Sequence, residues 1–107
     1  PAPSQKAIAT LLERAHALVP ALRAVPVRES WGSYIDSTPD AVPVISPTVG
    51  LKGLVLAAGL SGHGFGLGPG AGHLAADLAT GDTPIVDPRP FRHARLLDGS
   101  QGEVGEF

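Results

Sequence analysis

Every second residue between Gly62 and Gly72 is glycine, and this run limits the possible folds more than any other feature of the chain. Seven of the fourteen residues in positions 59–72 are glycine, which is half of the 14 glycines present. Alternating glycine disfavours both helices and strands, because its backbone loses much entropy on folding and it has no side chain to pack. A chain accepts that loss where its backbone turns sharply or lies close against a ligand. We therefore expect the function to lie in this segment.

The glycine run separates an apolar stretch from a helical pattern. Residues 54–58 are continuously apolar and predict a buried strand that is covered on both faces. Residues 69–80 predict a helix, with Pro69 at its first position and Gly81 just past its end. A strand, a glycine loop and a helix in this order direct backbone N–H groups at a bound anionic or polar group.

The remaining elements are short. Apolar residues at helical spacing predict a helix over residues 4–19, with Ser4 as its N-cap and Pro20 marking its end. Residues 25–31 predict an irregular or edge strand and residues 42–45 a short strand, and turns are expected at 37–40 and 49–53. The sequence thus predicts an α+β fold with two helices and three or four short strands.

Composition excludes several classes of function. A chain of 107 residues forms one small domain or part of a larger one. The net charge of −2 gives no basic surface for nucleic acid, and no apolar run approaches the roughly 20 residues of a membrane span. No signal peptide is recognisable, so a cytoplasmic location is expected. The chain opens with Pro1 and contains no methionine, so we expect a processed protein or a piece of a longer one.

Common nucleotide, metal and nucleophile motifs fail in the glycine run. A Walker A loop is excluded because no lysine follows these glycines. A dinucleotide fingerprint can be aligned with residues 66–71, with Asp87 as the later acid, but the loop before it is too long for the tight first turn. The four histidines are far apart and cysteine is absent, so no metal site is expected. Ser61 lacks the flanking pattern of a nucleophile elbow.

Three side chains are candidates for a ligand pocket. His63 has glycine on both sides, so its imidazole stands in an open loop, where it either contacts a ligand or only makes loop hydrogen bonds. Trp31 and Tyr34 are the only tryptophan and the only tyrosine of the chain. A lone aromatic residue usually belongs to a core, but both lie close to the turn at residues 37–40 and could line a pocket.

A series of blocks resembles the carboxy-terminal part of the D-amino-acid oxidase-like flavoenzymes, a group that includes sarcosine and glycine oxidases and D-amino-acid dehydrogenases. In chain order the blocks are Trp31-Gly32, Thr38-Pro39-Asp40, Pro43-Val44-Ile45, Gly53-Leu54 and the segment AGLSGHGFGLGP at residues 58–69. The resemblance extends over about residues 11–95, and the glycine block with its preceding strand is its most specific part.

The resemblance implies a division of the chain. It would be the carboxy-terminal part of a two-domain, FAD-binding flavoenzyme of glutathione-reductase-like fold. Residues 1–53 would end the substrate-binding domain, residues 54–81 would return to the FAD-binding domain, and residues 82–107 would form a proline-rich segment and a flexible tail. The amino-terminal FAD fingerprint is missing here, so the partner would be an FAD-binding portion of the same protein or a companion chain.

The resemblance also implies site residues and a reaction. The cofactor would be non-covalent FAD, because no cysteine is present to bond the flavin. The flavin ring would be contacted by Gly62, His63, Gly64, Phe65 and Gly66, with His63 at the ring edge or in the substrate pocket and as the candidate catalytic residue. The reaction would oxidise the C–N bond of a small amine or amino acid by hydride transfer to flavin, giving an imine.

Two features leave the substrate open. Some relatives have a lysine after Gly-Phe that binds the substrate carboxylate, and Gly66 stands there in this chain. Others have an arginine just before the turn at residues 37–40, and residues 34–37 contain none. The alternative to a flavoenzyme is a small non-catalytic α/β binding module, whose glycine loop holds a phosphate-containing ligand or a partner.

Overall fold

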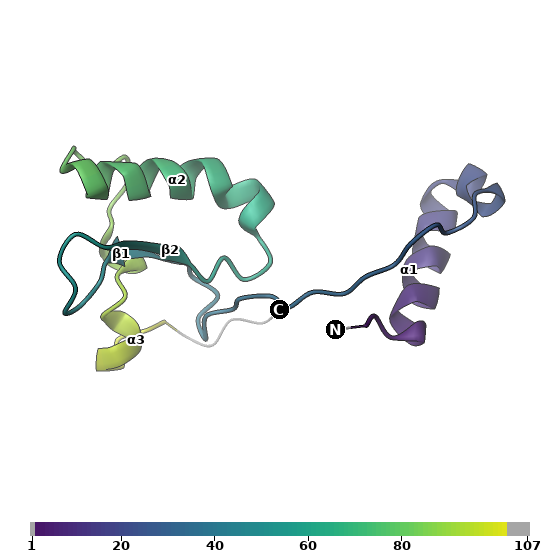
Figure 1. Cartoon of the computed structure of the whole chain (residues 1–107), viewed down its shortest axis with the longest axis horizontal. Coiled ribbons are helices and arrows are strands. Elements are labelled where there is room, and N and C mark those ends of the chain that lie inside the picture. Colours follow the sequence, from purple (N-terminus) through teal and green to yellow (C-terminus); the bar gives the residue numbers. More distant parts are fainter. Residues whose placement is uncertain (1, 103–107) are drawn as a thin grey trace. The chain divides into compact units, whose positions relative to one another are not determined.

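The computed structural model describes residues 2–102 and divides the chain into two compact units, Pro1–Tyr34 and Ile35–Phe107. Helices and a small antiparallel sheet are both present, so the predicted α+β class is confirmed (Figure 1). In the described part, three α-helices and two strands occur, rather than the two helices and three or four strands expected. Each unit is described in turn.

The first unit consists of helix α1 (Gln5–Leu18), the 3₁₀ helix η1 (Pro20–Ala24) and an extended segment. The Ser4 side chain accepts a hydrogen bond from the Ala7 N–H at 3.1 Å, so the predicted N-cap is confirmed. Residues 25–31 form no strand, and this prediction was wrong. Pro26 cannot donate to a ladder, and no described strand pairs with the segment.

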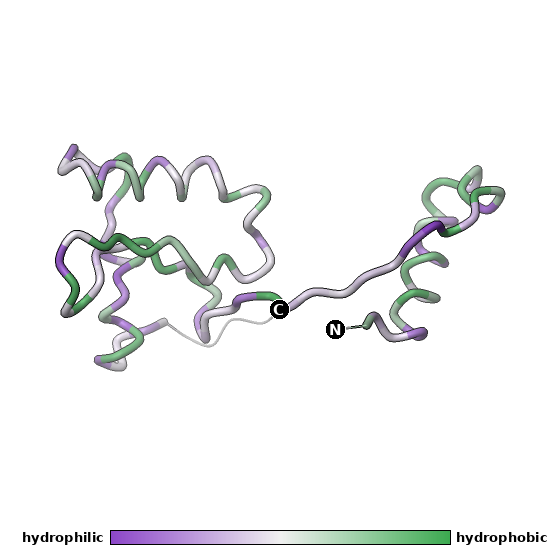
Figure 2. Tube along the Cα trace, viewed as in Figure 1, coloured by the Kyte–Doolittle hydropathy of each residue, from purple (hydrophilic) through white to green (hydrophobic). Residues whose placement is uncertain are grey.

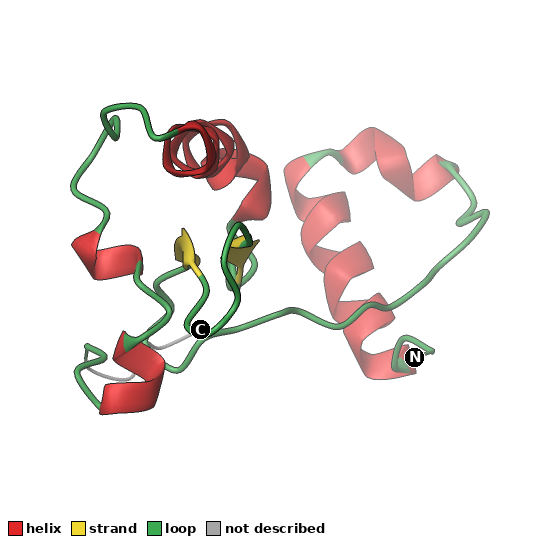
Figure 3. Ribbon diagram, turned by 60° about the vertical axis from the view of Figure 1, so that its left-hand side comes forward, coloured by secondary structure: helices red, strands yellow, loops and turns green. Residues whose placement is uncertain are grey.

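The second unit is built on strands β1 (Val44–Pro47) and β2 (Val55–Ala58), which pair antiparallel with Val44 opposite Ala58. Figure 2 shows hydrophobic residues concentrated on this hairpin. Helix α2 (Gly64–Thr80) lies over one face of the sheet and runs along the strands (Figure 1 and Figure 3). The core lies between α2 and the sheet and consists of Ile45, Ala71 and Leu74, with Leu60, Ala75, Leu78 and Phe91 packed against it.

Strand β2 is less buried than predicted. Its residues are half-buried or exposed, whereas a strand covered on both faces would be buried throughout. The continuous apolar sequence was read as double cover, but among the described elements only α2 contributes many contacts beyond the partner strand. An apolar surface of this strand therefore remains open in the described chain.

Helix α2 begins at Gly64, five residues before the predicted start at Pro69. Five glycines and the proline thus lie inside the helix, three of the glycines in the part before Pro69, although each disfavours a helix intrinsically. The packing of Ala71 and Leu74 on the sheet outweighs these local preferences, because most helical stability in proteins comes from tertiary contacts. The predicted end is confirmed, since Gly81 adopts a left-handed conformation and donates its N–H to the Asp77 carbonyl.

The proline-rich segment contains two short helices, η2 (Arg89–Phe91) and α3 (Arg95–Asp98). Phe91 packs on the core, and Arg95 is almost fully buried. This segment is therefore an integral part of the second unit up to Asp98. The flexible tail was predicted from Asp98 onward; in its described part the Ser100 N–H donates to the Asp98 carboxylate at 2.8 Å, and residues 103–107 lie outside the described residues.

Candidate functional site

The turn between β2 and α2 consists of residues 59–63 and bends through three left-handed conformations. Gly59 has a φ of +67°, Ser61 of +49° and Gly62 of +79°. Glycine adopts such angles without a steric cost, whereas serine does so rarely. His63 follows as the N-cap of α2, and its N–H donates to the Leu60 carbonyl at 2.8 Å. The glycines at positions 59 and 62 thus turn the chain sharply from strand to helix.

Residues 36–38 hold this turn in place through hydrogen bonds. The Gly59 N–H donates to an Asp36 carboxylate oxygen at 2.7 Å, and the Ser61 N–H donates to the Asp36 carbonyl at 3.0 Å. The Thr38 N–H donates to the Ser61 hydroxyl oxygen at 3.2 Å, and that hydroxyl donates to the Gly59 carbonyl at 3.1 Å. Thr38 and Ser61 are both buried. The turn is therefore fastened by the Asp36 carboxylate and by backbone groups of Asp36 and Thr38, which lie 23 residues before Gly59 and Ser61.

The predicted turn at residues 37–40 is confirmed and is itself held by a buried ion pair. The Ala41 N–H donates to the Thr38 carbonyl at 3.2 Å, which closes the turn. The Arg95 guanidinium donates to both carboxylate oxygens of Asp40, at 2.8 and 3.0 Å. The hydrogen bonds from Arg95 hold the pKa of Asp40 well below its usual range, and the Val42 N–H bonds the same carboxylate.

Sequence reasoning missed this pair because its members are 55 residues apart. Arg95 stands three residues after Arg92 and three before Asp98, so its charge gave no local signal of a buried partner. Ser61 and Thr38 were seen as parts of motifs, but their contact depends on the tertiary structure.

Four of the five predicted flavin-contact residues border one hollow at the start of α2. It has a volume of about 290 Å³ and is lined by Gly62, His63, Phe65, Gly66 and Leu67. The fifth predicted residue, Gly64, lies between them in the chain, and its α-carbon faces Leu60. The His63 side chain is exposed, and that of Phe65 is fully exposed.

The first turn of α2 offers free hydrogen-bond donors. The backbone N–H groups of Gly64, Phe65 and Gly66 have no acceptor among the described residues. They point along the positive end of the helix dipole, and the first turn has no acidic side chain that would compete for them. We expected a flat loop here, but residues 64–66 are helical, so their N–H groups all point toward the amino-terminal end of the helix.

These features fit the edge of a flavin ring. A Cβ built on Gly66 meets no atom within 4 Å, so the backbone side of the hollow is open to a planar group. Free N–H groups match the oxygen and nitrogen acceptors of a flavin, and the exposed Phe65 ring supplies an apolar contact. The residues present are thus compatible with the cofactor that the resemblance implies.

The two aromatic candidates lie in the first unit. Trp31 is 77% exposed and Tyr34 is 86% exposed, so neither belongs to a core in the described chain. His73, interpreted from the sequence as structural, lies on α2 with its imidazole 3.5 Å from the Asp77 carboxylate. The exposure of Trp31 and Tyr34 does not test their pocket roles, which stay predictions.

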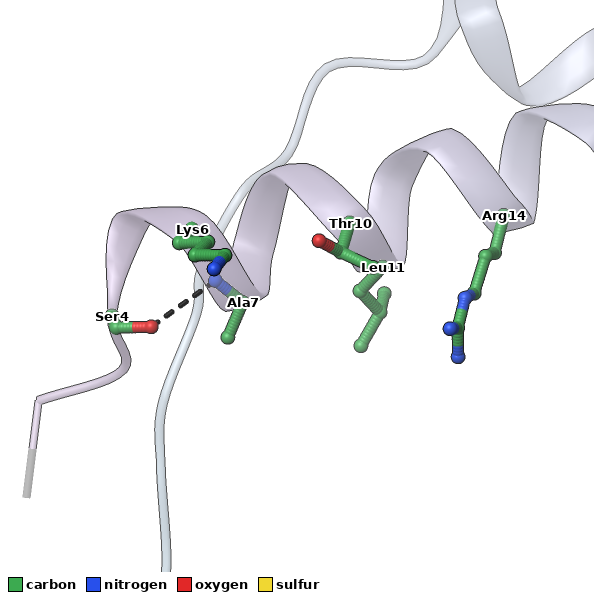
Figure 4. A pocket seen from close by; sticks show the side chains of 6 residues that line it. All are labelled: Ser4, Lys6, Ala7, Thr10, Leu11 and Arg14. Atoms are coloured by element: carbon green, nitrogen blue, oxygen red, sulfur yellow. Dashed lines mark hydrogen bonds between the residues drawn. The ribbon is translucent and has the colours of Figure 1, made fainter.

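A second hollow lies on α1 and contains none of the predicted site residues. It has a volume of about 510 Å³ and is formed by side chains along one side of this helix (Figure 4). The lining residues are Ser4, Lys6, Ala7, Thr10, Leu11 and Arg14. Within residues 2–102, no helix combines the length and hydropathy that crossing a membrane requires, and no cluster of three or more ligating side chains could hold a metal ion.

A family profile and individual relatives both relate this chain to oxidoreductases. The profile of the family described as "FAD dependent oxidoreductase" matches residues 1–78. Glycine oxidase of Pseudomonas putida is 35% identical over 89 residues, which is 83% of this chain and 24% of that protein. N-methyl-L-tryptophan oxidase of Salmonella newport is 43% identical over 61 residues, which is 57% of this chain and 16% of that protein.

A solved structure supports the same likeness. L-amino acid deaminase from Proteus vulgaris superimposes with a TM-score of 0.71 and 30% sequence identity, covering 86% of this chain and 21% of that one. The chain therefore spans about a quarter or less of the length of the proteins it matches. The resemblance to flavoenzymes that was read from the sequence blocks is confirmed.

Proposed function

The chain belongs to the family of FAD-dependent oxidoreductases, and we propose that it supplies the flavin-ring contacts of an enzyme that oxidises the C–N bond of an amine or amino acid. The observation that supports this role most directly is the cluster of free N–H groups at residues 64–66 beside an open hollow. The three relatives described above are named for amino-acid substrates, which favours this substrate class. FAD, when bound, accepts a hydride from the carbon next to the amine, and the product is an imine.

The start of α2 stabilises negative charge. The N–H groups of Gly64, Phe65 and Gly66 donate to an acceptor in the hollow, and the helix dipole adds a partial positive charge of about half a unit. Donors that are fixed before the reaction lower the energy of a charge that develops during it, typically by about 2.7–4 kcal/mol for each well-placed donor. This chain would therefore favour the reduced flavin, which has gained negative charge, over the oxidised flavin.

His63 and Phe65 border the same hollow with different chemistry. The exposed imidazole of His63 is able to exchange a proton or bind a substrate carboxylate, so it is the candidate catalytic residue. The exposed ring of Phe65 would cover the ligand and exclude water. Trp31 and Tyr34 are proposed separately as candidates for a substrate pocket.

The partner of this chain would be an FAD-binding portion, on the same polypeptide or a companion chain. A two-stranded sheet is marginally stable by itself, and the described residues pair only β1 with β2. An apolar hollow of about 420 Å³ opens between α2, β1 and the segment around Ile85. The missing three quarters of the relatives' length would cover these surfaces, with residues 54–81 returning to the FAD-binding domain and residues 1–53 ending the substrate domain.

The test is a pair of glycine substitutions in one helix. Gly66→Val places a side chain in the hollow, while Gly72→Val adds the same side chain about two turns later in the helix. A Cβ at either position has no atom of this chain within 4 Å, so neither substitution causes a clash within it. The measurement is the flavin absorbance of the assembled flavoprotein, meaning this chain together with its FAD-binding portion. We expect Gly66→Val to lose bound flavin and Gly72→Val to keep it. An equal flavin content in both variants, or a colourless wild-type protein, would refute the proposal.

A further inference from the structure

Ser61 is a left-handed residue that is not glycine, and it lies directly before the candidate flavin contact. We infer that Ser61 is a positioning residue, whose hydroxyl, held by Thr38, fixes the direction of Gly62, His63 and the first turn of α2. The inference rests on the proposed function, since it concerns the same flavin contact. It adds a residue that is not among those lining the hollow at the start of α2 and that acts through its neighbours.

The conformation of Ser61 is costly, so something must hold it. Its φ of +49° is rare for a residue with a Cβ, and such backbone strain persists only where the surroundings enforce it. Ser61 is 4% exposed, and its hydroxyl accepts from the Thr38 N–H and donates to the Gly59 carbonyl. Through these two bonds the Ser61 hydroxyl oxygen joins Gly59, at the start of the turn, to Thr38 in the earlier segment. The hydroxyl therefore holds both segments together.

Thr38 is itself immobilised on both sides. Its hydroxyl donates to the Val42 carbonyl at 2.8 Å and lies 3.4 Å from the Ser61 hydroxyl oxygen. The adjacent Asp40 is fixed by Arg95, which is 3% exposed and also donates to the Val42 carbonyl. The turn before α2 is thus connected through Thr38 and Asp40 to the carboxy-terminal helix α3.

The residues after Ser61 have little support of their own. The N-cap His63 makes no side-chain capping bond, and the start of α2 is closed by the backbone bonds from His63 to Leu60 and from Leu67 to His63. Donors contribute to charge stabilisation only when they are held within about 0.5 Å of their working position. Ser61 lies three residues before Gly64 in the chain, and its hydroxyl bonds the segment that Thr38 holds.

The test separates the hydroxyl from the backbone strain. Ser61→Ala removes the hydroxyl and keeps the strained Cβ, whereas Ser61→Gly removes both. Thr38→Ser is the matched control, because it keeps the hydroxyl and the N–H that face residue 61. All three are made in the assembled flavoprotein, and the readouts are the FAD dissociation constant and the position of the visible flavin absorption band.

We expect both Ser61 variants to raise the FAD dissociation constant about tenfold and to shift the band, because each leaves a buried donor without its acceptor. Thr38→Ser should keep the wild-type values. Ser61→Gly should have a melting temperature at least as high as that of Ser61→Ala, because glycine adopts a φ of +49° without strain. If Ser61→Gly remains folded and still loses flavin affinity, the loss comes from the missing hydroxyl. The inference is overturned if Ser61→Gly or Ser61→Ala binds FAD like the wild type with an unshifted band.

The outcome can be separated from that of the proposed function. If Gly66→Val removes flavin while both Ser61 variants keep the wild-type affinity and spectrum, the ring contact stands and the positioning role of Ser61 fails. If Gly66→Val has no effect, the ring contact itself fails.

Discussion

Breaking the Asp40–Arg95 ion pair should destabilise the second unit more than any substitution on its surface. The Arg95 guanidinium makes two hydrogen bonds to the Asp40 carboxylate, at 2.8 and 3.0 Å, and the two side chains are 3% and 2% exposed. Removing one partner leaves the other charge buried and uncompensated, which typically costs about 3–5 kcal/mol. Since a domain is stable by only about 5–15 kcal/mol, this is a large share of the total.

Three variants measure the coupling. Arg95→Met keeps the length of the side chain without its charge, Asp40→Asn keeps the shape without the charge, and the double variant leaves no unpaired charge. We expect each single variant to lose about 3–5 kcal/mol of the free energy of unfolding. The double variant should lose less than the sum, by about 1–3 kcal/mol, because the two groups share one network.

The assay is hydrogen exchange of the backbone amides of β1, β2 and α2. Fluorescence would be uninformative, because Trp31 is the only tryptophan and lies exposed in the first unit. Exchange reports opening of the second unit by itself and does not require the whole chain to unfold in one step. A loss below about 1 kcal/mol in Arg95→Met, a value typical of an exposed ion pair, would refute the reasoning, as would additive losses in the double variant.

Two further predictions concern the same part of the molecule. The pKa of Asp40 is lowered in the folded state, so its contribution to stability is fully present above the unfolded pKa of about 3.9 and is lost as the pH falls toward the folded pKa. An acid titration followed by circular dichroism should therefore show a steeper loss of structure below about pH 4 in the wild type than in the Asp40→Asn variant, and parallel curves would contradict this. A Cβ at Gly59 would lie 2.5 Å from the Thr38 methyl carbon, so Gly59→Ala should destabilise the chain by more than the ~1–2 kcal/mol of its left-handed conformation. Adding Thr38→Ser, which removes that methyl group, should recover the excess in a thermal melt, and no recovery would show that the clash is not the cause.

Local signals predicted those parts of the fold that depend on neighbouring residues. Ser4 and Pro20 gave the bounds of α1 to within one residue, and Gly81 gave the end of α2. The turn closed by Ala41 and Thr38 was likewise readable, since proline and aspartate favour it by themselves. Each of these features is determined by a few consecutive side chains.

Long-range packing decided the parts that were missed. The start of α2 at Gly64 overrides the low helix propensity of glycine through contacts of Leu74 with the sheet, which no local pattern reveals. The strand expected at residues 25–31 has no partner in the described chain. The candidate site stays a prediction that the glycine-rich sequence suggests, and its support by Ser61 and Arg95 depends on contacts 23 and 55 residues away.

The ion pair between Asp40 and Arg95 also has a consequence for synthesis on the ribosome. The 55 residues between them take roughly 3–11 s to translate at about 5–20 residues per second. Ser61 is added 34 residues before Arg95, so the chain contains the turn at residues 59–63 about 2–7 s before the guanidinium that binds Asp40. A nascent chain thus forms the buried Asp40–Arg95 pair only after Arg95 of α3 has been made.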